Sequence, residues 1–136
     1  MKELEIDAKV DNLPQVLAFI DEALEEAECG MKAQMQIDIA VEEIYVNIAH
    51  YAYAPGEGKA VIRMEIGGEP KAAKITFLDR GVPYDPLARE DPDVTLSAEE
   101  RSVGGLGIFM VKKSMDDVFY SYEDGQNVLT ITKNLI

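Results

Sequence analysis

Two polar side chains, Glu43 and Asn47, lie four residues apart in a segment with helical periodicity. They therefore project from one helix face, a single turn apart, on the flank of an apolar stripe. A carboxylate can orient or deprotonate a hydroxyl group, and an amide oxygen can ligate Mg²⁺. Solvated helix faces also carry such pairs, so the pair alone does not separate a catalytic site from an ordinary surface.

A second candidate site lies at the end of a predicted strand, where Asp79 comes two residues before Gly81. An ionised carboxylate in that place can accept a hydrogen bond from the amino group of adenine. Glycine has no Cβ, so Gly81 lets a flat ring approach the backbone. Aspartate and glycine are also common turn residues, and a plain turn is the alternative.

A third candidate site is the run Gly104-Gly105-Leu106-Gly107, which leads directly into a predicted helix. Free amides and the positive end of a helix dipole favour phosphate at such a place. The run is not a Walker A motif, because no Gly-Lys-Ser/Thr follows, and Met110 stands where a Rossmann fingerprint needs its last glycine. A phosphate-binding turn and a hinge before the helix both fit the pattern.

Hydrophobic periodicity predicts the elements that must position these residues. The predicted elements are strands over residues 2–10, 60–66, 73–78, 118–122 and 128–132, and helices over 13–27, 32–52 and from Gly104 onwards. Residues 82–103 lack periodicity, and a loop of that length is often a functional lid. The order predicts one domain over residues 1–136 with an α+β fold. We expect a two-layer α/β sandwich whose sheet is mixed but mostly antiparallel, with helices on one face.

The composition narrows the classes of partner. The net charge is −13, from 26 acidic and 13 basic residues, and such a field repels nucleic acid and anionic lipid. No apolar run approaches the length that crosses a bilayer, and the N-terminus lacks the apolar core of a signal peptide. The single cysteine, Cys29, cannot form an internal disulfide. We therefore expect a cytoplasmic protein with no direct nucleic-acid or membrane contact.

Together, the order and spacing of the three motifs resemble the ATPase domain shared by histidine kinases, gyrase-type topoisomerases and mismatch-repair proteins. The segment Glu43-Ile-Tyr-Val-Asn47 is similar to that family's N box, Asp79-Arg-Gly81 to its first glycine box, and 104–107 to its second. The resemblance covers roughly residues 37–136. The small size, and the phrases over 41–53 and 104–116, resemble the anti-sigma factor serine kinase branch.

The resemblance implies ATP and Mg²⁺ as cofactors, with residues 82–103 as an ATP lid. The residues it implies in nucleotide binding are Asn47, which would also ligate Mg²⁺, Asp79 for adenine, and Gly81, Gly104, Gly105, Leu106 and Gly107. Glu43 would be the catalytic base for an attacking serine hydroxyl. Arg101 is a candidate for offsetting charge on the transferred phosphate, with a surface ion pair to a neighbouring glutamate as the alternative.

The function implied by the resemblance is that of a protein serine/threonine kinase. It would bind a sigma factor and phosphorylate a serine of an anti-anti-sigma partner, and it would form a homodimer. A non-catalytic nucleotide sensor and a slow ATPase are the alternatives, because binding needs only Asp79, Asn47 and the glycine turn. Gln126 and Asn127 stand near the position where many relatives carry a threonine that supports the adenine-binding aspartate, so the support of Asp79 is open.

Overall fold

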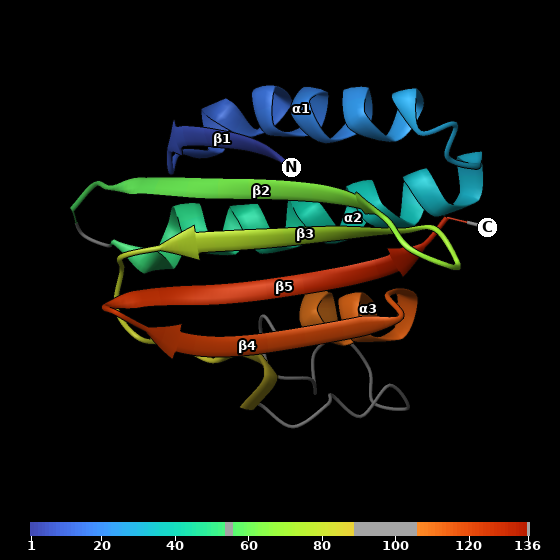
Figure 1. Cartoon of the computed structure of the whole chain (residues 1–136). Coiled ribbons are helices and arrows are strands. Elements are labelled where there is room, and N and C mark those ends of the chain that lie inside the picture. Colours follow the sequence, from blue (N-terminus) through green and yellow to red (C-terminus); the bar gives the residue numbers. More distant parts are fainter. Residues whose placement is uncertain (54–55, 89–105, 136) are drawn as a thin grey trace.

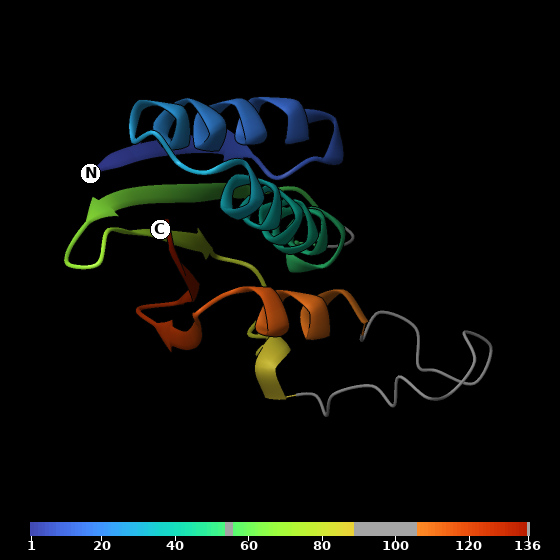
Figure 2. The same ribbon diagram turned by 90° about the vertical axis from the view of Figure 1, so that its right-hand side faces the viewer.

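The computed structural model describes residues 1–53, 56–88 and 106–135. In this part of the chain, helices cover one face of a five-stranded sheet, which confirms the predicted α+β sandwich (Figures 1 and 2). The helices are α1 (Leu13–Glu26), α2 (Met31–Asn47) and α3 (Leu106–Ser114). The strands are β1 (Lys2–Asp7), β2 (Lys59–Gly67), β3 (Ala72–Asp79), β4 (Asp117–Glu123) and β5 (Gln126–Asn134).

The strands are ordered β1-β2-β3-β5-β4, and each neighbouring pair of described strands is antiparallel. The chain leaves β3, passes through α3 and returns as β4, two places away in the sheet. Strand β5 then fills the place between them by a hairpin from β4 (Figure 1). Antiparallel pairing brings the last residue of β3, Asp79, opposite Asn127 near the start of β5. The strand order thus joins two residues that are far apart in the sequence.

The core lies between the sheet and the inner faces of the helices. Helix α1 buries Val16, Ile20 and Leu24 at helical spacing, and α2 buries Ile37, Val41 and Ile44 in the same way. Each such side chain contributes about 1.5–3 kcal/mol when it leaves water completely. No helix in the described residues is both long enough and apolar enough to cross a membrane.

A buried tyrosine joins α2 to the end of β1. The hydroxyl of Tyr45 lies 2.9 Å from the carbonyl oxygen of Asp7 and 2.7 Å from that of Lys9, and it accepts the Lys9 N–H at 3.1 Å. A fully buried phenol needs such partners, because an unpaired hydroxyl in a core is costly. These bonds accompany the end of β1 at Asp7, three residues earlier than predicted.

Helix α2 ends differently from the prediction. Its α-helical part stops at Asn47, and residues Ile48–Ala52 form a π-helical turn in place of the last predicted α-helical residues. The wider turn brings the carbonyl of Ala52 to the N–H of Val82, at 2.9 Å. Of the predicted lid, residues 82–88 are described and include a 3₁₀ turn at Pro86–Ala88, while 89–103 lie outside the described residues.

Candidate functional site

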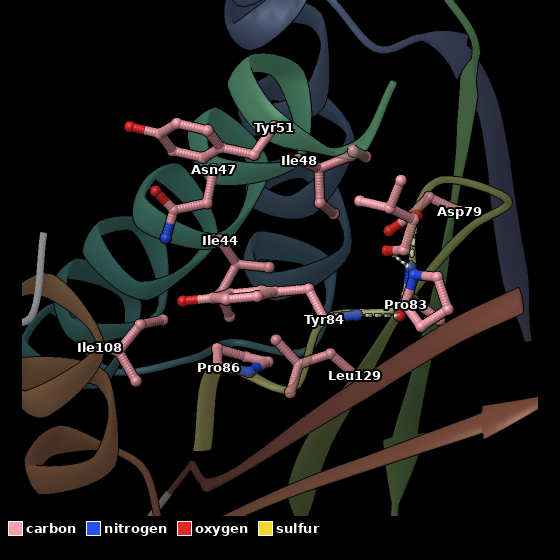
Figure 3. Close-up of a pocket in the computed structure, with 13 residues that line it drawn as sticks. Ile44, Asn47, Ile48, Tyr51, Asp79, Pro83, Tyr84, Pro86, Ile108 and Leu129 are labelled. Carbon is pink, nitrogen blue, oxygen red and sulfur yellow. Dashed lines mark hydrogen bonds between the residues drawn. The ribbon is translucent and has the colours of Figure 1, made fainter. Parts of the chain in front are cut away.

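A cavity of about 480 Å³ opens beside the C-terminal half of α2, the end of β3 and the first turn of α3 (Figure 3). Its lining is mainly aliphatic and aromatic, with a few polar side chains from three elements. The lining residues are Ile44, Asn47, Ile48, Tyr51, Ala52, Asp79, Val82, Pro83, Tyr84, Pro86, Ile108, Asn127 and Leu129. An apolar cavity of this size with a few convergent polar groups is the usual form of a small-molecule site.

Asp79 contributes a buried carboxylate to the cavity. Hydrogen-bond donors of the protein hold only one of its two oxygens. Its Oδ1 accepts the N–H of Gly81 at 2.9 Å and the Nδ2 of Asn127 at 2.9 Å. Its Oδ2 accepts no hydrogen bond from the described residues. A carboxylate oriented in this way presents one free acceptor to the cavity, which suits a ligand that offers an N–H group.

Asn127 is the functional residue whose role the sequence left open. Its Nδ2 donates to Asp79 and to the carbonyl oxygen of Val82, both at 2.9 Å. Its Oδ1 accepts the N–H of Tyr84 at 3.1 Å and the hydroxyl of Tyr120. Both amide hydrogens and both acceptor positions are therefore used inside the protein. Asn127 thus supports Asp79, which answers the question that the absence of a threonine near this position left open.

The hydroxyl that completes this network stays protonated. Burial raises the pKa of Tyr120 above its ordinary value, so its O–H remains a donor to Asn127 at neutral pH. The signal for Asn127 in the sequence was its place, with Gln126, in the predicted turn over residues 124–127, near the position where many relatives carry a threonine. That turn predicts where β5 begins, but the neighbour of β5 depends on the strand order.

Gly81 makes a close backbone contact that the sequence did not predict, and its role beside a ligand stays a prediction. A Cβ at this position would lie 2.2 Å from the carbonyl oxygen of Ala52, so only glycine lets the loop after β3 pass so close to the end of the π-helical turn. Gly81 lies beside the cavity and is not one of its lining residues. Its own N–H helps to orient Asp79 at 2.9 Å.

Glu43, Asn47 and Gly107 come together at the other side of the cavity. Asn47 lines the cavity, and its Nδ2 donates to Oε1 of Glu43 at 3.4 Å. A Cβ on Gly107 would lie 2.0 Å from that same oxygen, so the Glu43 carboxylate packs directly on the first turn of α3. Negative charge is favourable at a helix N-terminus. The structure thus brings two of the three predicted motifs into contact.

The remaining predicted residues can be placed only in part. Leu106 begins α3, and Gly104, Gly105 and Arg101 lie outside the described residues. The Oδ1 of Asn47 accepts no hydrogen bond from the described residues, so it fits an ion that takes oxygen ligands. The described residues contain no group of three or more His, Cys, Asp or Glu that could hold a metal. Mg²⁺, which keeps several waters and often binds through few protein groups, fits such a place better than an ion that needs a full protein cage.

The fold and its cavity define a two-layer α/β sandwich with a ligand-sized site between helices and sheet. The chain belongs to the histidine kinase-like ATPase domain family, whose family model matches residues 6–133. The family predicted from the order of the three motifs is thereby confirmed.

Relatives of this chain include bacterial protein kinases. The serine/threonine-protein kinase BtrW of Bordetella bronchiseptica is 22% identical over 131 residues, which cover 96% of this chain and 92% of BtrW. The serine-protein kinase RsbW of Listeria monocytogenes serovar 1/2a is 31% identical over 97 residues, or 68% of this chain. That match spans 61% of the Listeria protein. These names agree with the serine-kinase branch predicted from the sequence.

A solved structure shows the same fold. It contains the RsbU and RsbW domains of Rv1364c from Mycobacterium tuberculosis, and it superposes with a TM-score of 0.68 at 19% sequence identity. The match covers 99% of this chain and 33% of the mycobacterial one. The likeness agrees with the two-layer fold described above.

Proposed function

We propose that this chain is an ATP-dependent protein serine/threonine kinase of the anti-sigma factor type. The observation that carries the proposal is the pairing of a free acceptor, Asp79 Oδ2, on one side of the cavity with the Glu43–Asn47 pair on the other. The first fits the base of a nucleotide, and the second fits its phosphate end. Family membership and the names of the relatives support the same reading.

Adenine recognition would depend on Asp79. Its Oδ2 would accept a hydrogen bond from the amino group of adenine, while Asn127 and Gly81 hold its other oxygen. Guanine carries a carbonyl oxygen where adenine carries that amino group, and two acceptors facing each other would both lose a hydrogen bond. We therefore infer a site that prefers ATP over GTP.

The phosphates would lie near the first turn of α3, with Gly104, Gly105, Leu106 and Gly107 as the amide donors. Bound Mg²⁺ would offset the charge of the phosphates, which matters in a protein of net charge −13. Asn47 would hold that ion through Oδ1. Glu43 would fix the amide of Asn47, so that its oxygen faces the cavity. Arg101 stays the predicted residue for the transferred phosphate.

In the reaction, Glu43 would take the proton of a substrate serine hydroxyl. The serine oxygen forms its bond to the γ-phosphorus as the bond to the β–γ bridging oxygen breaks, and ADP leaves with that oxygen. The products are phosphoserine and ADP, with the proton on Glu43. The proposed substrate is an anti-anti-sigma protein, and the proposed second partner is a sigma factor. A cytoplasmic homodimer completes the proposal, on the family resemblance.

Replacement of the carboxylate tests the kinase proposal. Transfer of labelled phosphate from ATP to the partner is measured with Mg²⁺ present. Glu43→Gln keeps the size of the side chain that packs on Gly107, and it should slow transfer about 100-fold or more while ATP still binds. Glu42→Gln is the matched control, because Glu42 is the exposed neighbour on α2. Transfer that survives Glu43→Gln at the normal rate would remove Glu43 from the base role.

A non-catalytic nucleotide sensor is the second candidate, and one observation favours it. The Glu43 carboxylate packs on Gly107 and bonds to Asn47, and Glu43 is not among the residues that line the cavity. A carboxylate in that position could serve only to orient Asn47 and to stabilise α3. Single-turnover kinetics separate the two functions. Tight ATP binding with no phosphorylated partner and no ADP after hours would establish the sensor.

A further inference from the structure

Tyr84 is an aromatic residue on the cavity that the proposed function does not use. Figure 3 shows its ring lying across the cavity, with Ile44 and Ile108 around it. The side chain lines the cavity although Tyr84 is 50% exposed. A half-exposed aromatic ring over an aliphatic surface offers a flat face to any ligand that enters.

The backbone of Tyr84 is held in place from several directions. Its N–H donates to Oδ1 of Asn127 at 3.1 Å, the same side chain that orients Asp79. Proline residues at 83 and 86 restrict the backbone on either side of it. The side chain of Asp85 accepts the N–H of Leu87 at 2.8 Å, which closes a local turn. The ring therefore projects from a fixed backbone that is tied to the base-recognising carboxylate.

We propose that Tyr84 is a base-stacking residue, whose ring covers the purine that Asp79 binds at its edge. The inference rests on the proposed nucleotide function. The purine would lie between the Tyr84 ring and other aliphatic side chains that line the cavity, among them Ile48. Stacking is tolerant of base identity, so Tyr84 adds affinity and Asp79 adds selectivity. Asn127 holds both groups in one unit.

Tyr51 offers an internal comparison. It also lines the cavity and is 65% exposed. Its ring, however, packs edge-on against His50, with 5.9 Å between ring centroids, and Figure 3 shows it directed away from Asp79. No backbone hydrogen bond links Tyr51 to Asn127 in the described residues. Because Tyr51 lines the cavity as Tyr84 does, the matched control for substitutions at Tyr84 is Phe119, an aromatic residue of β4 that is 59% exposed and does not line the cavity.

The chain contains no tryptophan, which gives a direct optical test. In the Tyr84→Trp variant the only indole would lie over the cavity, and contact with adenine should quench its fluorescence on titration with ATP. Tripolyphosphate has no base and should leave the signal unchanged. The Phe119→Trp variant, whose indole lies outside the cavity, should respond little to either ligand. Equal responses of the two variants to ATP would overturn the stacking assignment.

Affinity provides the second measurement, by calorimetric titration of ATP and of tripolyphosphate. Tyr84→Leu keeps an apolar side chain and should weaken ATP binding about tenfold, with tripolyphosphate binding unchanged, while Tyr84→Phe should retain the affinity for ATP. Unchanged ATP binding by Tyr84→Leu would overturn the proposal and leave the proposed function intact. Failure of the unsubstituted protein to bind ATP would overturn both, so the two failures are distinguishable.

Discussion

At the scale of single residues, the groups that orient Asp79 differ from the group that is left to bind a ligand. Asp79 uses one oxygen for protein donors and leaves the other for a ligand. Asn127 makes four hydrogen bonds inside the protein and has no capacity left for a ligand. The free oxygen of Asp79 is therefore preorganised: its orientation is already fixed in the unliganded protein. Preorganisation lowers the entropic cost of binding a ligand.

Asp79→Asn should reverse the hydrogen-bond character of the cavity. The donors of Gly81 and Asn127 would hold the amide oxygen, so the new NH₂ group would face the cavity as a donor. Because a donor cannot pair with the amino group of adenine, ATP affinity should fall about 10-fold to 100-fold. Affinity for tripolyphosphate should stay the same, and discrimination against GTP should decrease. Calorimetry with the three ligands measures this; an equal loss of ATP and tripolyphosphate binding would contradict the adenine role of Asp79.

At the scale of elements, hydrophobic periodicity predicted where most helices and strands lie. It did not predict which elements contact one another. The apolar spacing of Ile37, Val41 and Ile44 was enough to predict α2 and its buried face. The π-helical turn at Ile48–Ala52 was not predictable, because its sequence continues the same apolar pattern. The turn ends in a hydrogen bond from the N–H of Val82 to the carbonyl oxygen of Ala52, a contact with a loop that lies about thirty residues later in the chain and that local pattern does not reveal.

The candidate site shows the same limit. Motif spacing brought Glu43, Asp79 and Gly107 to attention, because each residue type suits a nucleotide. The role of Asn127 could not be predicted with certainty, since it depends on β5 lying between β3 and β4. The packing of Glu43 on Gly107 depends in the same way on how α3 lies against α2. Local sequence carries periodicity, whereas these contacts are properties of the assembled layers.

Where α2 packs on α1, it carries a carboxyl group, Asp38, whose pKa is raised. Asp38 on α2 has an oxygen that is buried without a hydrogen-bond partner among the described residues. Burial first, and then the nearby Asp21 and Glu25 of α1, raise the pKa of Asp38 to about 7. Gln34 donates to Oδ1 of Asp21 at 3.2 Å, whereas the buried oxygen of Asp38 has no such donor among the described residues.

The free energy of unfolding should therefore fall as the pH rises from about 4 to about 7. The folded protein holds the Asp38 proton more tightly than the unfolded chain, whose pKa is near 3.8, so the penalty grows between about pH 4 and pH 7. Because Asp38 is only half-buried, solvent screening should limit the effect to about 1 kcal/mol. Asp38→Asn should flatten this pH dependence and stabilise the protein at pH 8. Urea unfolding across that range measures it.

The exposed Glu65 of β2 offers the control for that measurement. Glu65→Gln removes one negative charge without touching the contact between α1 and α2, so it should leave the pH dependence of unfolding as it is in the unsubstituted protein. A profile of Asp38→Asn that matches the profile of Glu65→Gln would show that Asp38 titrates as an ordinary surface carboxylate.

At the scale of the whole molecule, the charge of −13 opposes the ligand that the cavity suits. The repulsion acts at long range and is screened by salt, with a Debye length of about 30 Å at 0.01 M and about 8 Å at 0.15 M. At constant free Mg²⁺, the association rate of ATP should therefore rise several-fold between these salt concentrations, with little change in dissociation. Stopped-flow mixing measures both rates. Uncharged adenosine is the control, and an ATP association rate that falls with salt would contradict a dominant repulsive field.

The interior position of β5, between β3 and β4, has a mechanical consequence. This strand is bonded on both sides, to β3 and to β4, and is antiparallel to each. A force that pulls along β5 must shear two ladders of backbone hydrogen bonds at once. A force that pulls along the edge strand β1 shears only the ladder to β2. The Asp79–Asn127 pair stands at the end of the ladder between β3 and β5, and a bound nucleotide would brace it. A ligand in the cavity would then raise the mechanical force needed to unfold the chain.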